Sequence, residues 1–360
     1  MKAFLKKHKT KILLIFTIIV LAILSKVLLF NFLGYKYYAD SKTIVNFINS
    51  GTIIEDKSFG FTVKFFKLMN IFKFTTIYEW SIFLFIIFNL FMLLFLIKRK
   101  DKYSLIEYLF IICSIVLLNI YVFNISKDII QFIIFGIIYL IFTNLKINLN
   151  IKAILTFIIF LLEGLFFREY YAIIGMLFIF LYLVYLFFTK KKLNKNIGIK
   201  LLGISIITLF FGIIIIRLIS YNKYLDFINA RYYVNFYESG REDTVTIINN
   251  LLGYGNSYFK FILNYLINFI RLNLPLELLF KGIKYIPFVI FQLFISFNIY
   301  KILKKVNKNN ILIISLIISY LLVAIVFEPD FGSFIRHQSA FIIFYIEMIL
   351  RNNLKFRRIL

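Results

Sequence analysis

The sequence is poor in the charged residues that a water-soluble domain needs. Charged residues make up 16% of the 360 positions and hydrophobic residues 62%, whereas soluble domains have about 25% and about 45–50%. The apolar residues fall in stretches of bilayer-spanning length, separated by short polar breaks. This pattern excludes a soluble globule. It predicts an all-α, polytopic integral membrane protein with one membrane domain over residues 1–360.

Cysteine, histidine and proline are also scarce. The single Cys113 excludes an intramolecular disulfide, and His8 and His337 are too few to build a His/Cys zinc site. No paired acidic motif such as D-x-D is present, so we expect neither a metal nor a cofactor. Only 3 Pro and 14 Gly are available for broken helices, and no inverted repeat is visible, which weighs against a carrier.

Apolar runs of about 15–20 residues predict ten transmembrane helices. The first follows a lysine-rich N-terminus, and we expect it to be retained, because it is longer than a signal-peptide core and lacks a small-residue cleavage site. The predicted spans cover residues 12–30, 80–97, 105–122, 129–143, 153–167, 170–188, 201–219, 285–300, 311–327 and 338–350.

The net charge of +25 is better explained by topology than by nucleic-acid binding, because the basic clusters are short and occur at every second connection. Under the positive-inside rule these connections and both termini are cytoplasmic. Most carboxylates lie toward the opposite face, so chemistry is expected outside. Two long external segments, 31–79 and 220–284, are expected to hold interfacial amphipathic helices, or a re-entrant pair around Pro275.

The segment from Ala153 to Phe188 is too long for one crossing, because its 36 residues rise about 54 Å as a helix. It must fold back, and its charges place the turn at Arg168 and Glu169, at or just below the outer surface. A snorkelling turn explains this charged pair as well as a cavity-facing pair does.

A second polar string, residues 327–338, lies between the last two predicted spans. Pro329 and Ser333 are typical of helix punctuation, with Ser333 the expected N-cap. Arg336 and His337 then fall in the first turn of a membrane helix, where a cation opposes the helix dipole. We expect an anion to compensate them, and therefore a binding or catalytic role.

The arginines gather on the expected outer side, where guanidinium groups suit phosphate recognition better than lysines do. They are Arg168, Arg217, Arg231, Arg241, Arg271 and Arg336. Just past the first span, Asp40 follows Tyr35, Tyr37 and Tyr38. These rings can stack on a sugar while the carboxylate accepts a hydroxyl proton. Interfacial tyrosines and a helix-capping Asp40 are the simpler explanations.

Many spans, large external loops, Asp40, an arginine in an outer turn and the late string Gly332-Ser333-Phe334-Ile335-Arg336-His337 together resemble bacterial surface-polysaccharide polymerases of the Wzy type. More distantly, they resemble the GT-C group of lipid-linked glycosyltransferases. The string ends in Gln338, where this family more often has Arg.

The resemblance implies transfer of a growing chain from undecaprenyl pyrophosphate to another lipid-linked repeat unit, at the outer face of the bacterial plasma membrane. Membrane lipids, a flippase and a chain-length regulator are the implied partners. Catalytic roles would fall to Arg336, His337, Asp40 and Glu169. Substrate binding would fall to Arg168, Arg217, Arg271, Glu328 and Asp330.

Other functions remain open at the level of sequence. A polyprenyl-phosphate-sugar glycosyltransferase or a ligase would use similar residues. A flippase or transporter of lipid-linked sugars would place its charges at the bilayer midplane, whereas Lys26, Glu163, Arg217 and Glu347 lie toward the ends of the predicted spans. A scaffold without enzymatic activity has no specific support.

Overall fold

The computed structural model describes residues 2–34, 37–52, 56–99, 103–191, 196–238 and 246–356. These residues form helices joined by turns, with a single isolated β-bridge between Ile247 and Asp330. The all-α prediction is therefore confirmed. Contacts along the chain divide it into two compact units, of which unit 1 comprises residues 1–137 and 336–353 and unit 2 comprises residues 138–335 and 354–360.

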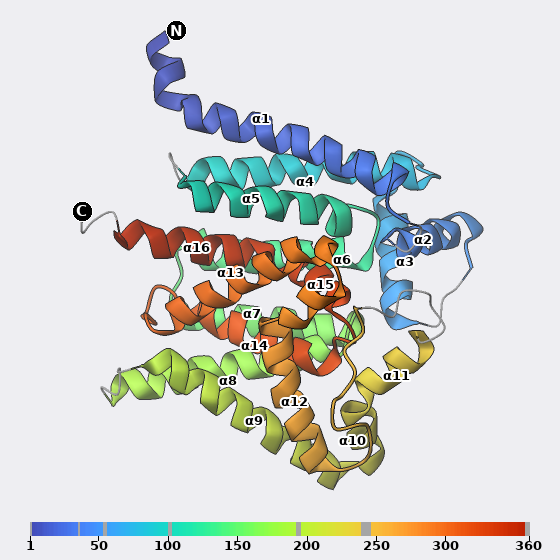
Figure 1. The fold of residues 1–360 in the computed structure, drawn as a ribbon, viewed down its shortest axis with the longest axis vertical. Coiled ribbons are helices and arrows are strands. Elements are labelled where there is room, and N and C mark those ends of the chain that lie inside the picture. The colour runs from blue at the N-terminus through green and yellow to red at the C-terminus, as the bar shows by residue number, and fades with distance from the viewer. Residues whose placement is uncertain are drawn as a thin grey trace. The chain divides into compact units, whose positions relative to one another are not determined.

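Unit 1 is built on three long helices that pack side by side (Figure 1). They are α1 (Lys2–Asn31), α4 (Ile77–Arg99) and α5 (Leu105–Leu117), the last extended by the π-helix η2 (Leu118–Val122). Two shorter helices, α2 (Ala39–Ser50) and α3 (Lys57–Met69), connect α1 to α4. The unit also contains the start of α6 (Lys127–Thr143), the end of α15 (Phe331–Ala340) and most of α16 (Ile342–Phe356).

Local sequence signals fix several helix ends in unit 1. Ser104 and Glu107 form a capping box at the start of α5, so each side chain bonds the other residue's backbone N–H. Asp56 caps α3 by accepting the Phe59 N–H at 2.7 Å. At the end of α2, Gly51 adopts a left-handed conformation with φ 70°, which a residue without a Cβ takes at little cost.

Unit 2 is built around α14 (Ile311–Phe327), in which every residue from Ile311 to Val326 is buried. It packs against α8 (Tyr170–Lys190), α9 (Ile197–Ile219), α11 (Ala230–Glu238) and α12 (Tyr258–Asn273). The remaining elements of unit 2 are α7 (Leu149–Phe166), α10 (Tyr221–Ile228), η4 (Leu276–Lys281), η5 (Ile283–Tyr285) and α13 (Ile286–Leu303).

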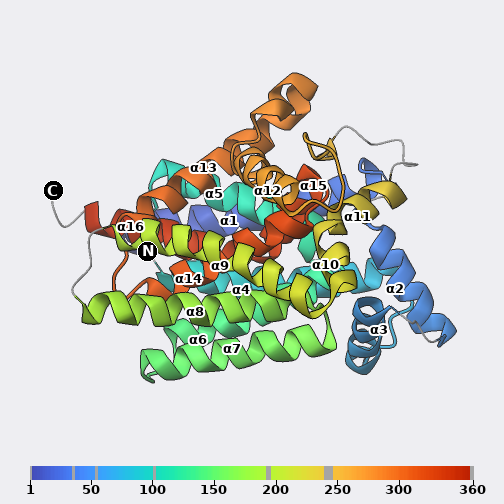
Figure 2. The same ribbon diagram turned by 90° about the horizontal axis from the view of Figure 1, so that it is seen from below.

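Helices α7 and α8 form the tightest helix pair of unit 2 and run side by side in Figure 2. A Cβ on Gly164 would lie 2.6 Å from the Ala172 Cβ, and one on Gly175 would lie 2.7 Å from the Phe160 Cβ. Small residues at these two points therefore let the helix backbones approach closely. The turn between the helices falls at residues 167–169, as the charges of Arg168 and Glu169 predict.

Seven helices among the described residues are long and apolar enough to cross a membrane, and each coincides with a predicted span. They cover Lys11–Asn31, Ile77–Lys98, Leu105–Val122, Leu149–Phe166, Tyr170–Lys190, Ile197–Ile219 and Ile283–Leu303. The predicted spans at 129–143 and 311–327 correspond to the 17-residue helices α6 and α14. The chain is thus a polytopic all-α membrane protein.

One predicted span and one of the two alternatives for the segment 220–284 were wrong. The predicted span 338–350 is not a single helix, because α15 ends at Ala340 and α16 begins at Ile342. The segment after Pro275 is the six-residue 3-10 helix η4, which is too short to pair with α12 as a re-entrant hairpin. The N-terminal half of the segment 220–284, which was predicted to be external, does contain amphipathic helices, α10 and α11.

Candidate functional site

The structure places the predicted site residues in both units. Unit 1 contains Asp40, Arg336 and His337, and unit 2 contains Arg168, Glu169, Arg217, Arg271, Glu328 and Asp330. Tyr35 and Arg241, two further residues singled out from the sequence, lie outside the described residues.

The unit 1 residues converge on a carboxylate that the sequence analysis did not select. Arg336 Nε lies 3.1 Å from Asp128 Oδ2, and Arg336 Nη2 lies 3.7 Å from Asp40 Oδ2. His337 Nε2 lies 3.7 Å from Asp128 Oδ1. One guanidinium is therefore shared by two carboxylates, and one of these carboxylates also faces the imidazole.

The helix positions of these residues favour the charges that they carry. Asp128 lies in the first turn of α6 and Asp40 in the first turn of α2, where the helix dipole stabilises anions. His337 lies in the last turn of α15, with Arg336 just before it. The expectation that both cations oppose a helix dipole was wrong, because the helix begins at Phe331 rather than after Ser333.

A small pocket, partly open to solvent, lies beside this cluster within unit 1. It is lined by Tyr37, Asp40, Ser41, Tyr121, Asn124, Ser126, Asp128 and Arg336. The rings of Tyr37 and Tyr121 are 6.0 Å apart at an interplanar angle of 33°. The Ser126 hydroxyl is buried and has no hydrogen-bond partner among the described residues. A buried polar atom of this kind is normally satisfied by water or a ligand.

Lys26 of α1 forms hydrogen bonds to the two residues that come directly after the π-helix η2, and one of them, Asn124, lines the pocket. Its ammonium donates to the Phe123 carbonyl at 2.7 Å and to Asn124 Oδ1 at 2.6 Å. Ser81 of α4 donates to the same Oδ1 at 2.9 Å. Helices α1 and α4 thereby fix the turn between η2 and α6, which carries Asn124 and Ser126 and leads into Asp128 at the start of α6. A π-helix at such a place is often associated with function.

The two carboxylates differ in accessibility. The Asp128 side chain is 3% exposed, whereas those of Asp40 and Arg336 are 33% and 32% exposed. Asp40 is therefore the carboxylate of the two that a ligand can reach.

The predicted residues of unit 2 do not form a comparable cluster. Arg168 Nη1 donates to the Tyr170 hydroxyl at 3.1 Å, while Glu169 is exposed at the start of α8. The Arg217 guanidinium lies over the Tyr224 ring at 5.5 Å from its centroid. Arg271 forms a two-pronged ion pair with Glu277, with both distances 2.8 Å.

Glu328 and Asp330 organise the start of α15 in unit 2. Asp330 Oδ1 accepts the Ser333 N–H at 2.8 Å, so Asp330 takes the capping role that the sequence had assigned to Ser333. The Ser333 hydroxyl donates to Glu328 Oε2 at 2.8 Å. Both acidic residues thus have structural roles at this helix end.

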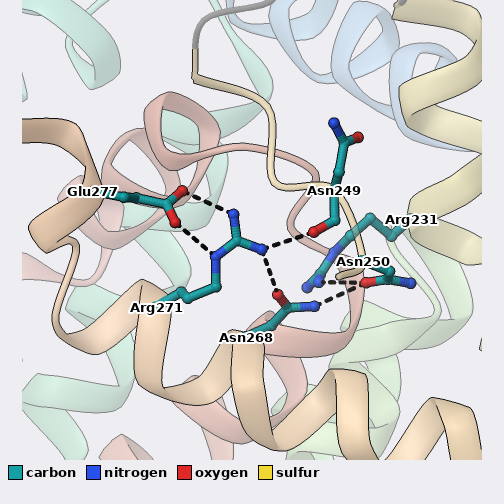
Figure 3. Close-up of polar contacts among 6 residues, drawn as sticks. All are labelled: Arg231, Asn249, Asn250, Asn268, Arg271 and Glu277. Carbon is teal, nitrogen blue, oxygen red and sulfur yellow. Dashed lines mark hydrogen bonds and ion pairs between the residues drawn. The ribbon is translucent and has the colours of Figure 1, made fainter. Parts of the chain in front are cut away.

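A second polar network, which sequence reasoning missed, connects the α11–α12 segment to the end of α14. Arg231 donates to the Glu328 carbonyl at 2.9 Å, to the Ile325 carbonyl and to Asn250 Oδ1 at 3.3 Å. Figure 3 shows Asn268 donating to the same Asn250 oxygen, while Arg271 contacts Asn268 and the Asn249 carbonyl. Desolvation by burial lowers the pKa of Arg231 to about 10.

Asp128 could have been found from one sequence signal. The string Ser126-Lys127-Asp128 stands between two predicted spans, and a carboxylate at a membrane boundary normally needs a partner. The contact with Arg336 depends on chain segments more than two hundred residues apart, which no local pattern reveals. Among the described residues, no group of three or more His, Cys, Asp or Glu side chains is arranged to hold a metal ion.

The fold and the cluster together define a class, a polytopic helical membrane protein with a charged pocket at one end of its unit 1 helices. The chain matches no protein-family model, and comparisons with curated proteins and with solved structures found no match.

Proposed function

We propose that this protein is a membrane glycosyltransferase that joins undecaprenyl-pyrophosphate-linked repeat units during surface-polysaccharide synthesis, as Wzy-type polymerases do. The observation that carries the proposal is the accessible Asp40 carboxylate, 3.7 Å from Arg336 in a pocket lined by Tyr37 and Tyr121. Aromatic rings bind sugar faces, and a carboxylate accepts the proton of an attacking hydroxyl.

In this proposal the unit 1 pocket binds the acceptor sugar. The acceptor hydroxyl oxygen forms a bond to the anomeric carbon of the donor, and the bond from that carbon to the phosphate oxygen breaks. The hydroxyl proton passes to Asp40, and the lipid pyrophosphate leaves with the bonding electron pair. Arg336 stabilises the charge that develops, while buried Asp128 holds Arg336 and His337 in place.

The proposed location is the outer face of the bacterial plasma membrane, with both chain termini in the cytoplasm. Within unit 1, α1 and α4 carry lysines at Lys11 and Lys98, and these ends are opposite to the ends from which the pocket segments emerge. By the positive-inside rule, this distribution favours a pocket that faces outward.

The proposal is tested in cells whose surface polysaccharide depends on this protein. We expect Asp40→Asn and Arg336→Ala to abolish polymer while the protein remains in the membrane, and lipid-linked single repeat units to accumulate. Asp226→Asn is the matched control, because Asp226 is an exposed aspartate of α10 in the other unit. Normal polymer length in both pocket variants would remove the proposal.

The accumulated intermediate separates related functions. Single repeat units on the outer leaflet indicate a polymerase, whereas complete polymer on the lipid indicates a ligase. Retention of the units on the inner leaflet indicates a flippase. Purified protein with lipid-linked repeat units then reports transfer directly.

A further inference from the structure

We propose that unit 2 contains a binding pocket for a phosphate-class anion, separate from the Asp40 pocket. The pocket is partly open to solvent and lies between α10, the start of α12 and residues 250–255. Its lining residues are Ile228, Asn229, Asn250, Gly253, Tyr254, Gly255, Lys260, Phe261 and Asn264. The inference concerns anion binding, and only its lipid-linked form rests on the proposed function.

The charge of the lining points to an anion. Lys260 is the charged residue of the set, and none of the nine lining residues is acidic. The Lys260 side chain is exposed on the first turn of α12. Ser257 caps this helix by accepting the Lys260 N–H, so the helix end itself is ordered.

Asn250, which lines the pocket, has a fixed amide orientation. Its Oδ1 accepts from Arg231 Nη1 at 3.3 Å and from Asn268 Nδ2 at 2.9 Å. Two donors on one oxygen fix which end of the amide faces Arg231 and Asn268. The Asn250 amide nitrogen consequently points away from both partners, as Figure 3 shows.

Arg231 supplies a buried positive charge behind this amide. It is 5% exposed, its three hydrogen bonds go to neutral oxygens, and it forms no ion pair with a described residue. The Glu328 carboxylate acts on it only at longer range. A desolvated guanidinium without a direct counter-charge is unfavourable, so an anion bound at the Asn250 amide would be stabilised by it.

The pocket loop, residues 250–255, is held in a defined shape by Asn264. Asn264 accepts the Leu252 N–H at 3.1 Å and donates to the Gly253 carbonyl at 3.0 Å. Gly253 and Gly255 have φ angles of 72° and 147°, and a Cβ on either would meet no atom within 4 Å. These backbone conformations favour glycine, which keeps the wall open.

Phosphate oxygens fit this set of donors, since they accept from an amide and from an ammonium at once. A pyrophosphate lipid headgroup and a free phosphate compound share this chemistry. Acetate carries a smaller charge and fewer acceptor oxygens than pyrophosphate, and it therefore serves as the control anion.

The test uses the purified full-length protein, with binding followed by calorimetry and by thermal shift. The probes are inorganic pyrophosphate in solution, and polyprenyl pyrophosphate or the uncharged polyprenol in nanodiscs. Asn250→Asp keeps an acceptor for Arg231 and Asn268 but adds a negative charge to the pocket wall. Lys260→Gln removes the cation, and Lys223→Gln on α10 is the matched control, because Lys223 is exposed and does not line the pocket.

We expect pyrophosphate to bind the wild-type protein. Its affinity should fall about tenfold in Lys260→Gln, because that variant lacks one charged hydrogen bond. Binding should be abolished in Asn250→Asp and unchanged in Lys223→Gln. If only polyprenyl pyrophosphate binds tightly, and the variants weaken its binding in the same order, the natural ligand is a lipid headgroup. The inference is overturned if neither pyrophosphate form binds, if acetate or polyprenol binds equally well, or if all three variants bind alike. Asp40→Asn should retain pyrophosphate binding, so failure of glycosyl transfer is distinguished from failure of this site.

Discussion

Arg336 Nε lies 3.1 Å from Asp128 Oδ2, and the Asp128 side chain is only 3% exposed. A buried carboxylate with a charged partner is part of the fold as well as of the pocket, because a buried charge is unfavourable unless a partner compensates it. Asp40, 33% exposed, contacts the same guanidinium from the accessible side. The same Asp→Asn substitution should therefore change the stability of the protein by different amounts at the two positions.

The first prediction compares Asp128→Asn with Asp40→Asn. We expect Asp128→Asn to destabilise the protein by about 2–3 kcal/mol, below the usual cost for a fully buried pair because Arg336 is partly exposed. Asp40→Asn should cost less than about 1 kcal/mol, as exposed ion pairs do. Thermal unfolding of both variants in the same detergent measures the difference. Equal midpoints would show that Asp128 has no special structural role.

Much of the fold could be predicted from the sequence, because span length and hydropathy are local properties. The α7–α8 turn at Arg168 and Glu169 followed from the length of one apolar segment. The break between α15 and α16 at Phe341 was not predictable in this way, since no proline or glycine marks it. Tertiary packing decides such a break.

The candidate site was predictable only in part. Asp40 and Arg336 stand out as charges at span boundaries, and the structure brings them together. The roles of Asp128 and Lys26 depend on the turn between η2 and α6. Arg231 and Asn250 meet only because α11 and the following loop return to the end of α14. Contacts between distant segments leave no periodic signal in the sequence.

The second prediction concerns pH and the cap of α3. Burial alone would raise the pKa of Asp56, but hydrogen bonds from the Phe59 N–H and the Ser58 hydroxyl, with the charge of Lys127, lower it below its ordinary value of 3.8. A carboxyl group with a lowered folded-state pKa stabilises the protein above its unfolded-state pKa. This contribution is lost as the pH falls through the folded-state value.

We therefore expect Asp56→Asn, which retains a capping oxygen, to be less stable than the wild type at pH 7. The two proteins should converge as the pH falls below about 3.8. Asp56→Ala also removes the capping oxygen and should cost about 1 kcal/mol at pH 7. Unfolding midpoints across this pH range provide the measurement. A difference between wild type and Asp56→Asn that does not change with pH would contradict the assignment.

The third prediction uses two glycines of α9 with opposite surroundings. A Cβ on Gly198 would meet the Leu303 carbonyl and lie 2.6 Å from Val306 Cγ2, whereas one on Gly203 would meet nothing within 4 Å. We expect Gly198→Ala to destabilise the protein by about 1–3 kcal/mol through overpacking. Gly203→Ala should be neutral or stabilise it by up to about 1 kcal/mol, because alanine favours helix. Similar thermal midpoints for both variants would refute the close contact at Gly198.

The last prediction concerns a buried amide pair that connects α4 with η2. Asn89 Nδ2 donates to Asn119 Oδ1 at 2.8 Å, and Asn119 Nδ2 donates to Asn89 Oδ1 at 3.0 Å. Each amide also donates to its own helix, Asn89 to the Phe85 carbonyl and Asn119 to the Ile115 carbonyl. These four hydrogen bonds join protein groups directly, with no bridging water. The pair is therefore suited to hold the π-helix in place near the pocket.

A double-mutant cycle with Asn89→Leu and Asn119→Leu isolates this pair. Either single change leaves a buried amide without its cross-helix partner, and we expect a loss of about 1–2 kcal/mol. The double variant should lose less than the sum of the two, with a coupling energy of about 0.6–1.7 kcal/mol. Unfolding midpoints supply the cycle, and the proposed glycosyl transfer, assayed on the same samples, reports on the pocket. Additive losses would mean that the two side chains do not interact, and the π-helix would then be held by Lys26 and Ser81 through Asn124 alone.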